Sequence, residues 1–161
     1  MAEEHPPARE GREKQRWDGD LRLVTGCLPV HNGRVYMIKS RKKADWVLPK
    51  GGWESDETAQ ECARREAYEE AGVEGEIGEL LYESEVIKKK SQSRVTWFVM
   101  NVTRVLDEWP EMRPRCVLSL EEAMATCNRP EMIAAMRSYQ SKLAAAATIA
   151  TAPPSQSEPQ A

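Results

Sequence analysis

The stretch Gly51–Val73, GGWESDETAQECARREAYEEAGV, decides the fold of this chain. Small apolar and charged residues alternate in it with helical spacing, so we expect an amphipathic helix over residues 58–71. Thr58 and Glu61 have the spacing of a capping box, and Gly72 stands where helices commonly end in a left-handed residue. The stretch therefore predicts one sharply bounded helix that follows a glycine-rich loop.

Three glutamates share one face of this predicted helix. At about 100° per residue, Glu70 lies about 40° from Glu66, and Glu69 lies about 60° to the other side. Beside them runs a stripe of small residues that allows close packing on a sheet: Ala59, Ala63, Ala67 and Ala71. Carboxylates gathered there repel one another and lose hydration, and a bound Mg²⁺ would offset both effects. The alternative is a solvated acidic surface neutralised by neighbouring arginines.

The rest of the chain mixes strands with helices. Residues 21–30 and 34–39 predict two strands joined by a turn at His31-Asn32-Gly33. Residues 94–106 are apolar on both faces, as in the central strand of a sheet. The remaining expected elements are a short buried segment at 46–48, a strand at 79–87, and helices at 120–127 and 130–143. The pattern predicts the α/β class, a sheet covered by helices.

Both ends of the chain have the composition of tails. Residues 1–15 are polar, and residues 144–161, AAAATIATAPPSQSEPQA, are of low complexity. Neither segment has enough apolar surface to offset the entropy of ordering. We therefore expect disordered tails at 1–15 and 144–161 around one domain at 16–143.

Composition narrows the class of protein. The 161 residues carry a formal net charge of −3 and are 40% hydrophobic, which suits one soluble domain. No apolar run reaches the roughly 18 residues of a membrane helix, and no signal peptide is visible. The four cysteines lack metal-type spacing, so neither zinc nor a disulfide framework is expected. We expect a cytoplasmic protein, with a nuclear location open, no membrane partner, and no specific nucleic-acid partner.

Charge is distributed in alternating blocks. Residues 39–50 hold five basic residues and one acidic residue, whereas residues 51–76 hold nine acidic and two basic ones. A second basic cluster comprises Lys88, Lys89, Lys90 and Arg94, with Arg113 and Arg115 further on. Like charges crowded together cost stability unless a ligand compensates them. A polyanion bridged by a divalent metal would need both kinds of block.

The central stretch resembles a complete Nudix box. The positions that carry the likeness are Gly51, Glu57, Arg65-Glu66-Ala67, Glu69-Glu70 and Gly72-Val73, with Ala67 smaller than the usual aliphatic residue. The resemblance implies an α/β/α sandwich around a mixed sheet. It also implies hydrolysis of a nucleoside diphosphate linked to another moiety, or of an analogous pyrophosphate, with Mg²⁺ or Mn²⁺.

Further segments resemble one branch of that family, the fungal-type diphosphoinositol polyphosphate and diadenosine polyphosphate phosphohydrolases. These are WDGD at 17–20, WVLPKGGWE at 46–54 and RPE at 129–131. The likeness spans residues 16–143 and is weaker at 107–118, where Arg115-Cys116-Val117 replaces an aromatic-containing segment. Lys50 stands where some relatives have glycine.

The resemblance implies roles for individual residues. Glu66 and Glu70 would be the principal metal ligands, and Glu69 would be a further ligand or the general base. Arg65 would orient a glutamate by ion pairing, with Glu57 as its partner. Two or three Mg²⁺ ions, or Mn²⁺ in their place, are implied. The substrate cleft would be formed by Arg16, Arg22, Ser40, Arg41, Lys50, Gly51, Gly52 and Arg94.

We therefore expect a monomeric pyrophosphohydrolase whose partner is a small polyphosphate. A water molecule would attack phosphorus and a P–O–P bond would break. One alternative is another Nudix substrate, namely ADP-ribose, a nucleotide sugar or an mRNA cap. These would call for a stacking aromatic residue, and several of the few aromatic residues look like core. The other alternative is a non-catalytic module that binds polyanions.

Overall fold

The computed structural model describes residues 5–151, without the side chains of residues 150 and 151. The predicted tail segments 1–4 and 152–161 lie outside these residues. The strands are β1 (Trp17–Asp18), β2 (Leu21–His31), β3 (Arg34–Lys39), β4 (Trp46–Val47), β5 (Lys50–Gly52), β6 (Val73–Ile87), β7 (Gln92–Val105) and β8 (Arg115–Ser119). The helices are α1 (Ala59–Glu66), α2 (Leu120–Thr126) and α3 (Pro130–Thr151), and a π-helical segment, Ala67–Ala71, continues α1.

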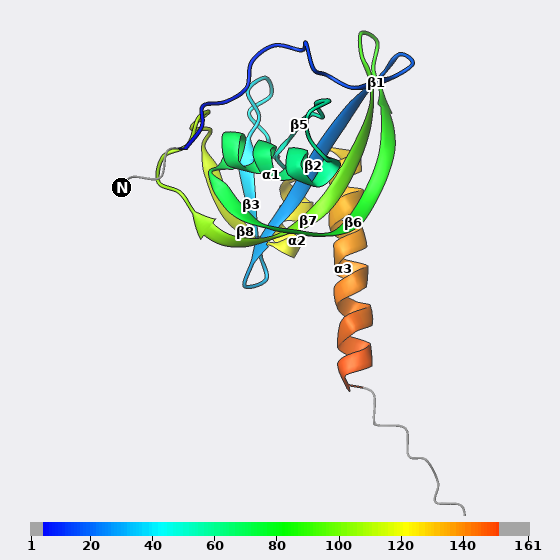
Figure 1. The fold of residues 1–161 in the computed structure, drawn as a ribbon. Helices are drawn as coiled ribbons and strands as arrows, with labels where there is room; N and C mark the ends of the chain where they lie inside the picture. The colour runs from blue at the N-terminus through cyan, green and yellow to red at the C-terminus, as the bar shows by residue number, and fades with distance from the viewer. Residues whose placement is uncertain (1–4, 152–161) are drawn as a thin grey trace, which may run out of the picture.

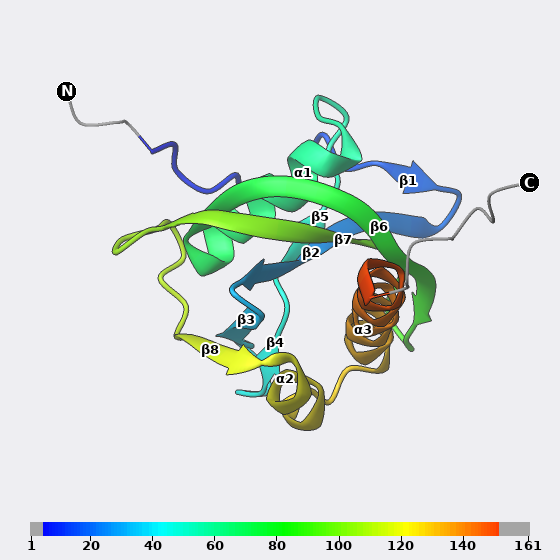
Figure 2. The ribbon, with the colours of Figure 1, turned by 90° about the horizontal axis from the view of Figure 1, so that it is seen from below.

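The strands form one mixed sheet (Figure 1). Its order is β4-β3-β2-β7-β6; β1 and β5 also pair with β2, and β8 pairs with β3. β2 and β7 are parallel, from Arg22 opposite Ser93 to Val30 opposite Asn101, whereas the other pairs are antiparallel. Figure 2 shows α1 on one side of the β2–β7–β6 region and α2 and α3 on the other. The predicted α/β sandwich around a mixed sheet is confirmed.

The hairpin and the central strand follow the sequence pattern. Asn32 (φ 50°) and Gly33 (φ 73°) both adopt the left-handed conformation that a two-residue hairpin turn favours. β7 lies between β2 and β6, and its Trp97 and Met100 side chains are fully buried in the core. Burial on both faces explains why residues 97–100 form a continuous apolar run.

β6 begins six residues before the predicted start at residue 79. It starts at Val73, directly after the helix, and its pairing with β7 is irregular between Glu74 and Gly75 and again between Ile77 and Leu80. Glycines and exposed glutamates in this first part break the alternation on which a strand prediction depends. The glycines that break the sequence pattern thus lie where the pairing of β6 with β7 is irregular.

The helix that carries the glutamates has the predicted boundaries. Thr58 Oγ1 accepts from the Glu61 N–H, and Glu61 Oε1 accepts from the Thr58 N–H, both at 3.1 Å, which completes the capping box. Gly72 ends the helix in the left-handed conformation, at φ 63°. Ala63, Ala67 and Ala71 are fully buried, so the small-residue stripe does face the sheet. The π-helical form of the last turn was not predicted.

Both expected tails contain ordered structure. α3 continues to Thr151 instead of ending at residue 143, and Figure 1 shows its last turns extending away from the sheet. Alanine-rich sequence favours a helix, and this outweighed the low complexity of the segment. Residues 5–15, which we call the N-terminal strap, pass over the carboxylate helix, where Pro6 O accepts from the Tyr68 hydroxyl at 2.6 Å. Within the described residues, no helix has the length and apolar character that a bilayer crossing requires.

Candidate active site

The glycine loop and the carboxylate helix meet at Gly51. β5 brings Gly51 opposite Thr25 of β2, and this places its backbone against the side chain of Glu66. A Cβ atom at Gly51 would come within 2.1 Å of Glu66 Oε1. Only glycine leaves room for the carboxylate, because any side chain would displace it. The adjoining residue, Lys50, faces the other part of the site.

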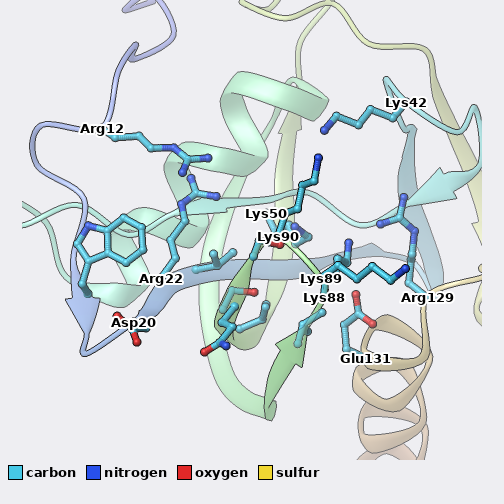
Figure 3. Close-up of a pocket in the computed structure, with 17 residues that line it drawn as sticks. Arg12, Asp20, Arg22, Lys42, Lys50, Lys88, Lys89, Lys90, Arg129 and Glu131 are labelled. Atoms are coloured by element: carbon cyan, nitrogen blue, oxygen red, sulfur yellow. The ribbon is translucent and has the colours of Figure 1, made fainter.

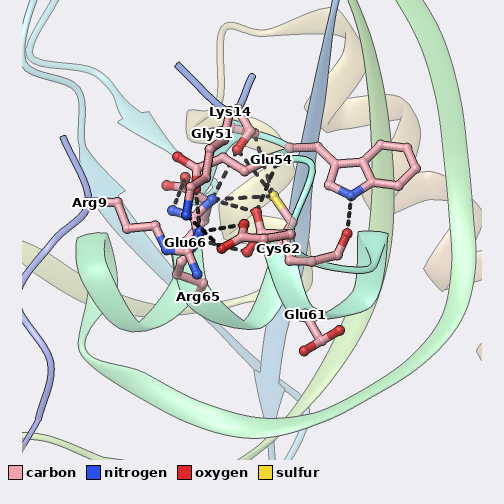
Figure 4. A network of polar contacts seen from close by, with 12 residues as sticks. Arg9, Lys14, Gly51, Glu54, Glu61, Cys62, Arg65 and Glu66 are labelled. Atoms are coloured by element: carbon pink, nitrogen blue, oxygen red, sulfur yellow. Dashed lines mark hydrogen bonds and ion pairs between the residues drawn. The ribbon is translucent and has the colours of Figure 1, made fainter. Parts of the chain in front are cut away.

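Arg65 links the glutamates to one another (Figure 4). Its Nη1 donates to Glu66 Oε1 at 3.0 Å and to Glu69 Oε2 at 2.8 Å. Its Nε and Nη2 donate to the two carboxylate oxygens of Glu57 at 2.9 and 2.7 Å, and Nη2 also donates to Gly52 O at 3.0 Å. Arg65 therefore occupies the ion-pairing position expected of it, between the helix and the glycine loop.

Glu66, Glu69 and Glu70, which we call the acidic cluster, are all buried. Burial raises the pKa of Glu66 to about 7, and the charge of Glu69 adds to this while Arg65 opposes it. Burial also raises the pKa of Glu70, with the charge of Glu66 as the next cause. Glu57 differs: burial works against its ionisation, but hydrogen bonds from Arg65 lower its pKa overall. The cluster holds more negative charge than its arginine partners offset.

The N-terminal strap contacts Glu69. The Arg9 N–H donates to Glu69 Oε1 at 2.5 Å, while Arg65 binds Oε2 of the same carboxylate. The Arg9 side chain is anchored by Glu54 and by Asp56, the latter at 2.8 Å. Both oxygens of Glu69 thus accept protein donors, so a role as proton acceptor requires that one of them be released.

A pocket of about 580 Å³ is lined by Lys50 and Arg22, among others (Figure 3). The charges of Glu70 and Glu66 act on Lys50 and Arg22 respectively, so the pocket lies beside the acidic cluster. We call it the basic pocket, because eight of its lining residues are basic and two are acidic. The basic ones are Arg12, Arg22, Lys42, Lys50, Lys88, Lys89, Lys90 and Arg129, and the acidic ones are Asp20 and Glu131. Burial lowers the pKa of both Lys50 and Arg22, and neighbouring positive charges lower it further. The pocket is therefore suited to a ligand with several negative charges.

The predicted substrate residues divide into two groups. Arg22 and Lys50 line the basic pocket, and Gly51 and Gly52 follow Lys50 in β5. The other four are not among the lining residues, and each has a protein partner. Arg16 donates to the carbonyls of residues 54, 55 and 57, and Ser40 Oγ accepts from Arg129 at 3.4 Å. Arg41 forms an ion pair with Glu111 at 2.5 Å, and Arg94 forms one with Asp18 at 2.8 Å.

Sequence reasoning missed several residues of the site. Arg12 belongs to the expected N-terminal tail, and Trp17, which is 52% exposed, also lines the pocket. Arg129 directly precedes α3, and Asp45 accepts a hydrogen bond from its Nε at 3.1 Å. Lys42 was part of the basic block at 39–50, so charge density was the one signal that could have found it.

Comparison with known proteins identifies the family. A model described as the NUDIX domain matches residues 20–139. This chain belongs to the Nudix family. Nudix hydrolase 12, mitochondrial, of Arabidopsis thaliana is 36% identical over 160 residues, which cover 82% of this chain and 79% of that protein. Diphosphoinositol polyphosphate phosphohydrolase 3-alpha of Mus musculus is 34% identical over 114 residues, with coverage of 65% and 69%.

The fold is also shared with solved structures of this family. The crystal structure of a C. elegans Ap4A hydrolase binary complex superposes with a TM-score of 0.63 and 20% identity, and covers 76% of this chain and 98% of that one. The chain is thus a Nudix hydrolase with the Nudix fold. The predicted family and the predicted fold class are both confirmed.

Nudix hydrolases generally depend on divalent metal, and the donors of this site fit such an ion. The acidic cluster offers several carboxylate oxygens, which Mg²⁺ and Mn²⁺ prefer, and burial limits competition from water. Within residues 5–151, no three acidic, His or Cys side chains already converge in a metal-binding arrangement. Arg65 instead holds oxygens of Glu66 and Glu69. Burial is the first cause of the raised pKa of Glu66 and of Glu70, and the charges of neighbouring glutamates add to it; a bound cation would offset both effects.

Proposed function

We propose that this Nudix hydrolase cleaves P–O–P bonds of diphosphoinositol polyphosphates and of diadenosine polyphosphates of the Ap5A and Ap6A type. The observation that carries the proposal is the basic pocket, with eight cationic side chains beside the acidic cluster. Substrates of both classes carry closely spaced negative charges, which arginine and lysine bind well. The likeness to a mouse protein named as a diphosphoinositol polyphosphate phosphohydrolase supports the same substrate class.

In the proposed reaction, Arg22 and Lys50 bind phosphate oxygens and orient the chain of phosphates toward the acidic cluster. Glu66 and Glu70 would hold Mg²⁺ or Mn²⁺, and the bound ion would neutralise charge on the phosphoryl group. Glu69 accepts a proton from the attacking water at Oε1 once the Arg9 N–H has withdrawn. A bond from the water oxygen to phosphorus forms, and the P–O bond to the leaving phosphate breaks.

A substrate panel with Mg²⁺ tests the proposal. We expect faster hydrolysis of a diphosphoinositol polyphosphate, of Ap5A and of Ap6A than of ADP-ribose, a nucleotide sugar or a capped RNA. Phosphate release and nucleotide products are measured at equal enzyme concentration. Preference for one of the last three compounds would contradict the substrate class and leave the family assignment intact. Absence of turnover with every compound, together with substrate binding, would favour the non-catalytic polyanion module.

A second candidate, a nucleotide-selective enzyme, is favoured by Trp17. Its exposed ring lines the basic pocket, and a base stacked on an aromatic ring gains about 1–3 kcal/mol. Trp17→Ala would then raise the KM for Ap6A and leave the KM for a diphosphoinositol polyphosphate unchanged. Equal effects on both substrates would remove this candidate. The monomeric state and the cytoplasmic location stay predictions.

A further inference from the structure

One segment, residues 106–115, binds the carbonyl groups at the end of the carboxylate helix. Carbonyls in a last helical turn have no intrahelical donor and need partners from elsewhere. Glu69 O accepts from Glu111 N at 3.0 Å, and Glu70 O accepts from Trp109 Nε1 at 2.9 Å. Arg115 Nη1 donates to Ala71 O at 2.8 Å and to Gly72 O at 3.3 Å, and Gly72 O also accepts from Leu106 N at 2.8 Å. Four consecutive carbonyls are thus bound by one segment, which we call the clamp.

Trp109 lies at the centre of the clamp. Its ring covers Gly72, where a Cβ atom would come within 2.5 Å of ring atom Cδ2. The Arg115 guanidinium also stacks on the ring, 4.2 Å from its centroid. The ring is therefore held by two neighbours, and its N–H is directed at the Glu70 carbonyl. Glycine at position 72 serves both the left-handed helix end and this contact.

The clamp reaches the Glu70 carboxylate as well as its carbonyl. Arg113 Nη1 lies 3.8 Å from Glu70 Oε2, and Arg113 Nη2 is 3.2 Å from Glu111 of the same segment. Main chain and side chain of Glu70 are thus both contacted by residues that neighbour one another in sequence. Residues 67–71 are π-helical, a form that is rare and occurs mostly as single turns inside α-helices, frequently at functional sites.

We propose that Trp109 is a positioning residue for Glu70. Its indole N–H fixes the Glu70 peptide group and thereby the direction in which the Glu70 carboxylate enters the site. This inference rests on the proposed function only in that Glu70 is taken as a metal ligand. Trp109 is not among the residues that line the basic pocket, and its ring contacts Gly72, Arg115 and the Glu70 carbonyl. A residue that only capped the helix would contribute stability and leave metal affinity unchanged, so these two quantities separate the roles.

Trp109→Phe is the decisive variant, because it removes the N–H and keeps a ring for Gly72 and Arg115. Trp53→Phe is the matched control, since Trp53 Nε1 donates to Glu57 O at the same 2.9 Å but supports no residue of the acidic cluster directly. Mn²⁺ binding is titrated by the electron paramagnetic resonance signal of the free ion, and the melting temperature is measured in chelator. We expect about tenfold weaker Mn²⁺ binding in Trp109→Phe and less than a twofold change in Trp53→Phe.

Unchanged Mn²⁺ affinity in Trp109→Phe would overturn the proposal, and so would equal weakening in both variants or no Mn²⁺ binding by the parent protein. A measurement without substitution covers the case in which the variant does not fold. On titration of the parent with Mg²⁺, the indole N–H resonance of Trp109 should shift with the midpoint of metal binding, while that of Trp53 stays fixed. A silent Trp109 resonance would also overturn it. Intact Mn²⁺ binding without turnover of any proposed substrate would count against the proposed function and leave the role of Trp109 untouched.

Discussion

The acidic cluster and the basic pocket meet at Lys50 and Gly51, yet they are built in opposite ways. The glutamates of the cluster are buried, and Arg65 and residues of the clamp contact them at close range. The basic pocket draws its lysines from a loop after β6, a loop after β3 and strand β5. Lys88, Lys89 and Lys90 are exposed. One half of the site is fixed by protein partners, and the other half is left for a ligand to neutralise.

This difference indicates that the acidic cluster and the basic pocket have different functions. A group that must hold a cation in one geometry gains from rigid support, because small displacements of a catalytic group cost rate. Groups that bind a flexible chain of phosphates gain from reach, and lysine is a mobile point charge. We therefore expect changes in the acidic cluster to act on kcat and metal affinity, and changes in the basic pocket to act on KM.

The largest effect is expected from Glu66→Gln. The amide keeps the shape and the contact with Arg65 but removes a metal-binding charge. Loss of several kcal/mol of charge stabilisation corresponds to a decrease in kcat of about 10³-fold. The melting temperature without metal should not fall, because burial already disfavours the ionised form of Glu66 and the amide keeps an oxygen for Arg65. The exposed Glu76→Gln serves as the control, and a kcat within tenfold of the parent in Glu66→Gln would contradict the role of the cluster.

The sequence predicted the acidic half of the site far better than the basic half. Capping residues, a small-residue stripe and glutamates at helical spacing are local features, so the neighbours of Glu66 in sequence are also its neighbours in space. Arg12, Lys42 and Arg129 are far apart in sequence and come together only through the fold. Their approach depends on strand pairing and on the packing of α3, which a local pattern does not encode.

The same reasoning explains the errors at the ends of elements. The first part of β6 lacks alternation because Gly75 and Gly78 interrupt it, so residues 73–78 gave no strand signal. The strap was taken for a tail because its polar residues bury little apolar surface. Its order comes from long-range contacts such as Arg9 to Glu69, which a composition argument does not detect.

The second prediction concerns Lys50→Met in the basic pocket. Removal of a charged hydrogen-bond donor to phosphate should raise KM about tenfold, with kcat changed less. Burial lowers the pKa of Lys50, so the lysine is held in an unfavourable environment, and methionine should leave the melting temperature equal or higher. Steady-state kinetics and thermal unfolding check both parts. Lys142→Met on α3 is the control. A decrease confined to kcat in Lys50→Met would contradict the expectation that the basic pocket acts on KM.

The third prediction concerns pH and uses the metal-free protein. A carboxyl whose pKa is raised on folding, as for Glu66 from 4.5 to about 7, binds its proton more tightly in the folded state. Its contribution to stability is complete below pH 4.5 and is lost as the pH rises through about 7. Since metal binds the ionised form, Mg²⁺ should raise the melting temperature more at pH 8 than at pH 5. Equal increases at both pH values in thermal unfolding would argue against metal at this cluster.

The smallest effect is expected at Lys88, Lys89 and Lys90. The pocket lining holds two carboxylates, Asp20 and Glu131, against eight basic side chains. The main contribution of the three exposed lysines is therefore attraction of the polyanion over a distance. Replacement of all three by Gln should lower kcat/KM about fivefold at low ionic strength, and the difference should shrink as salt shortens the range of the interaction. Replacement by three arginines should restore the rate. If the Gln variant instead lost activity to the same degree at every salt concentration, the lysines would make direct contacts with the substrate, and the basic half of the site would be as fixed as the acidic half.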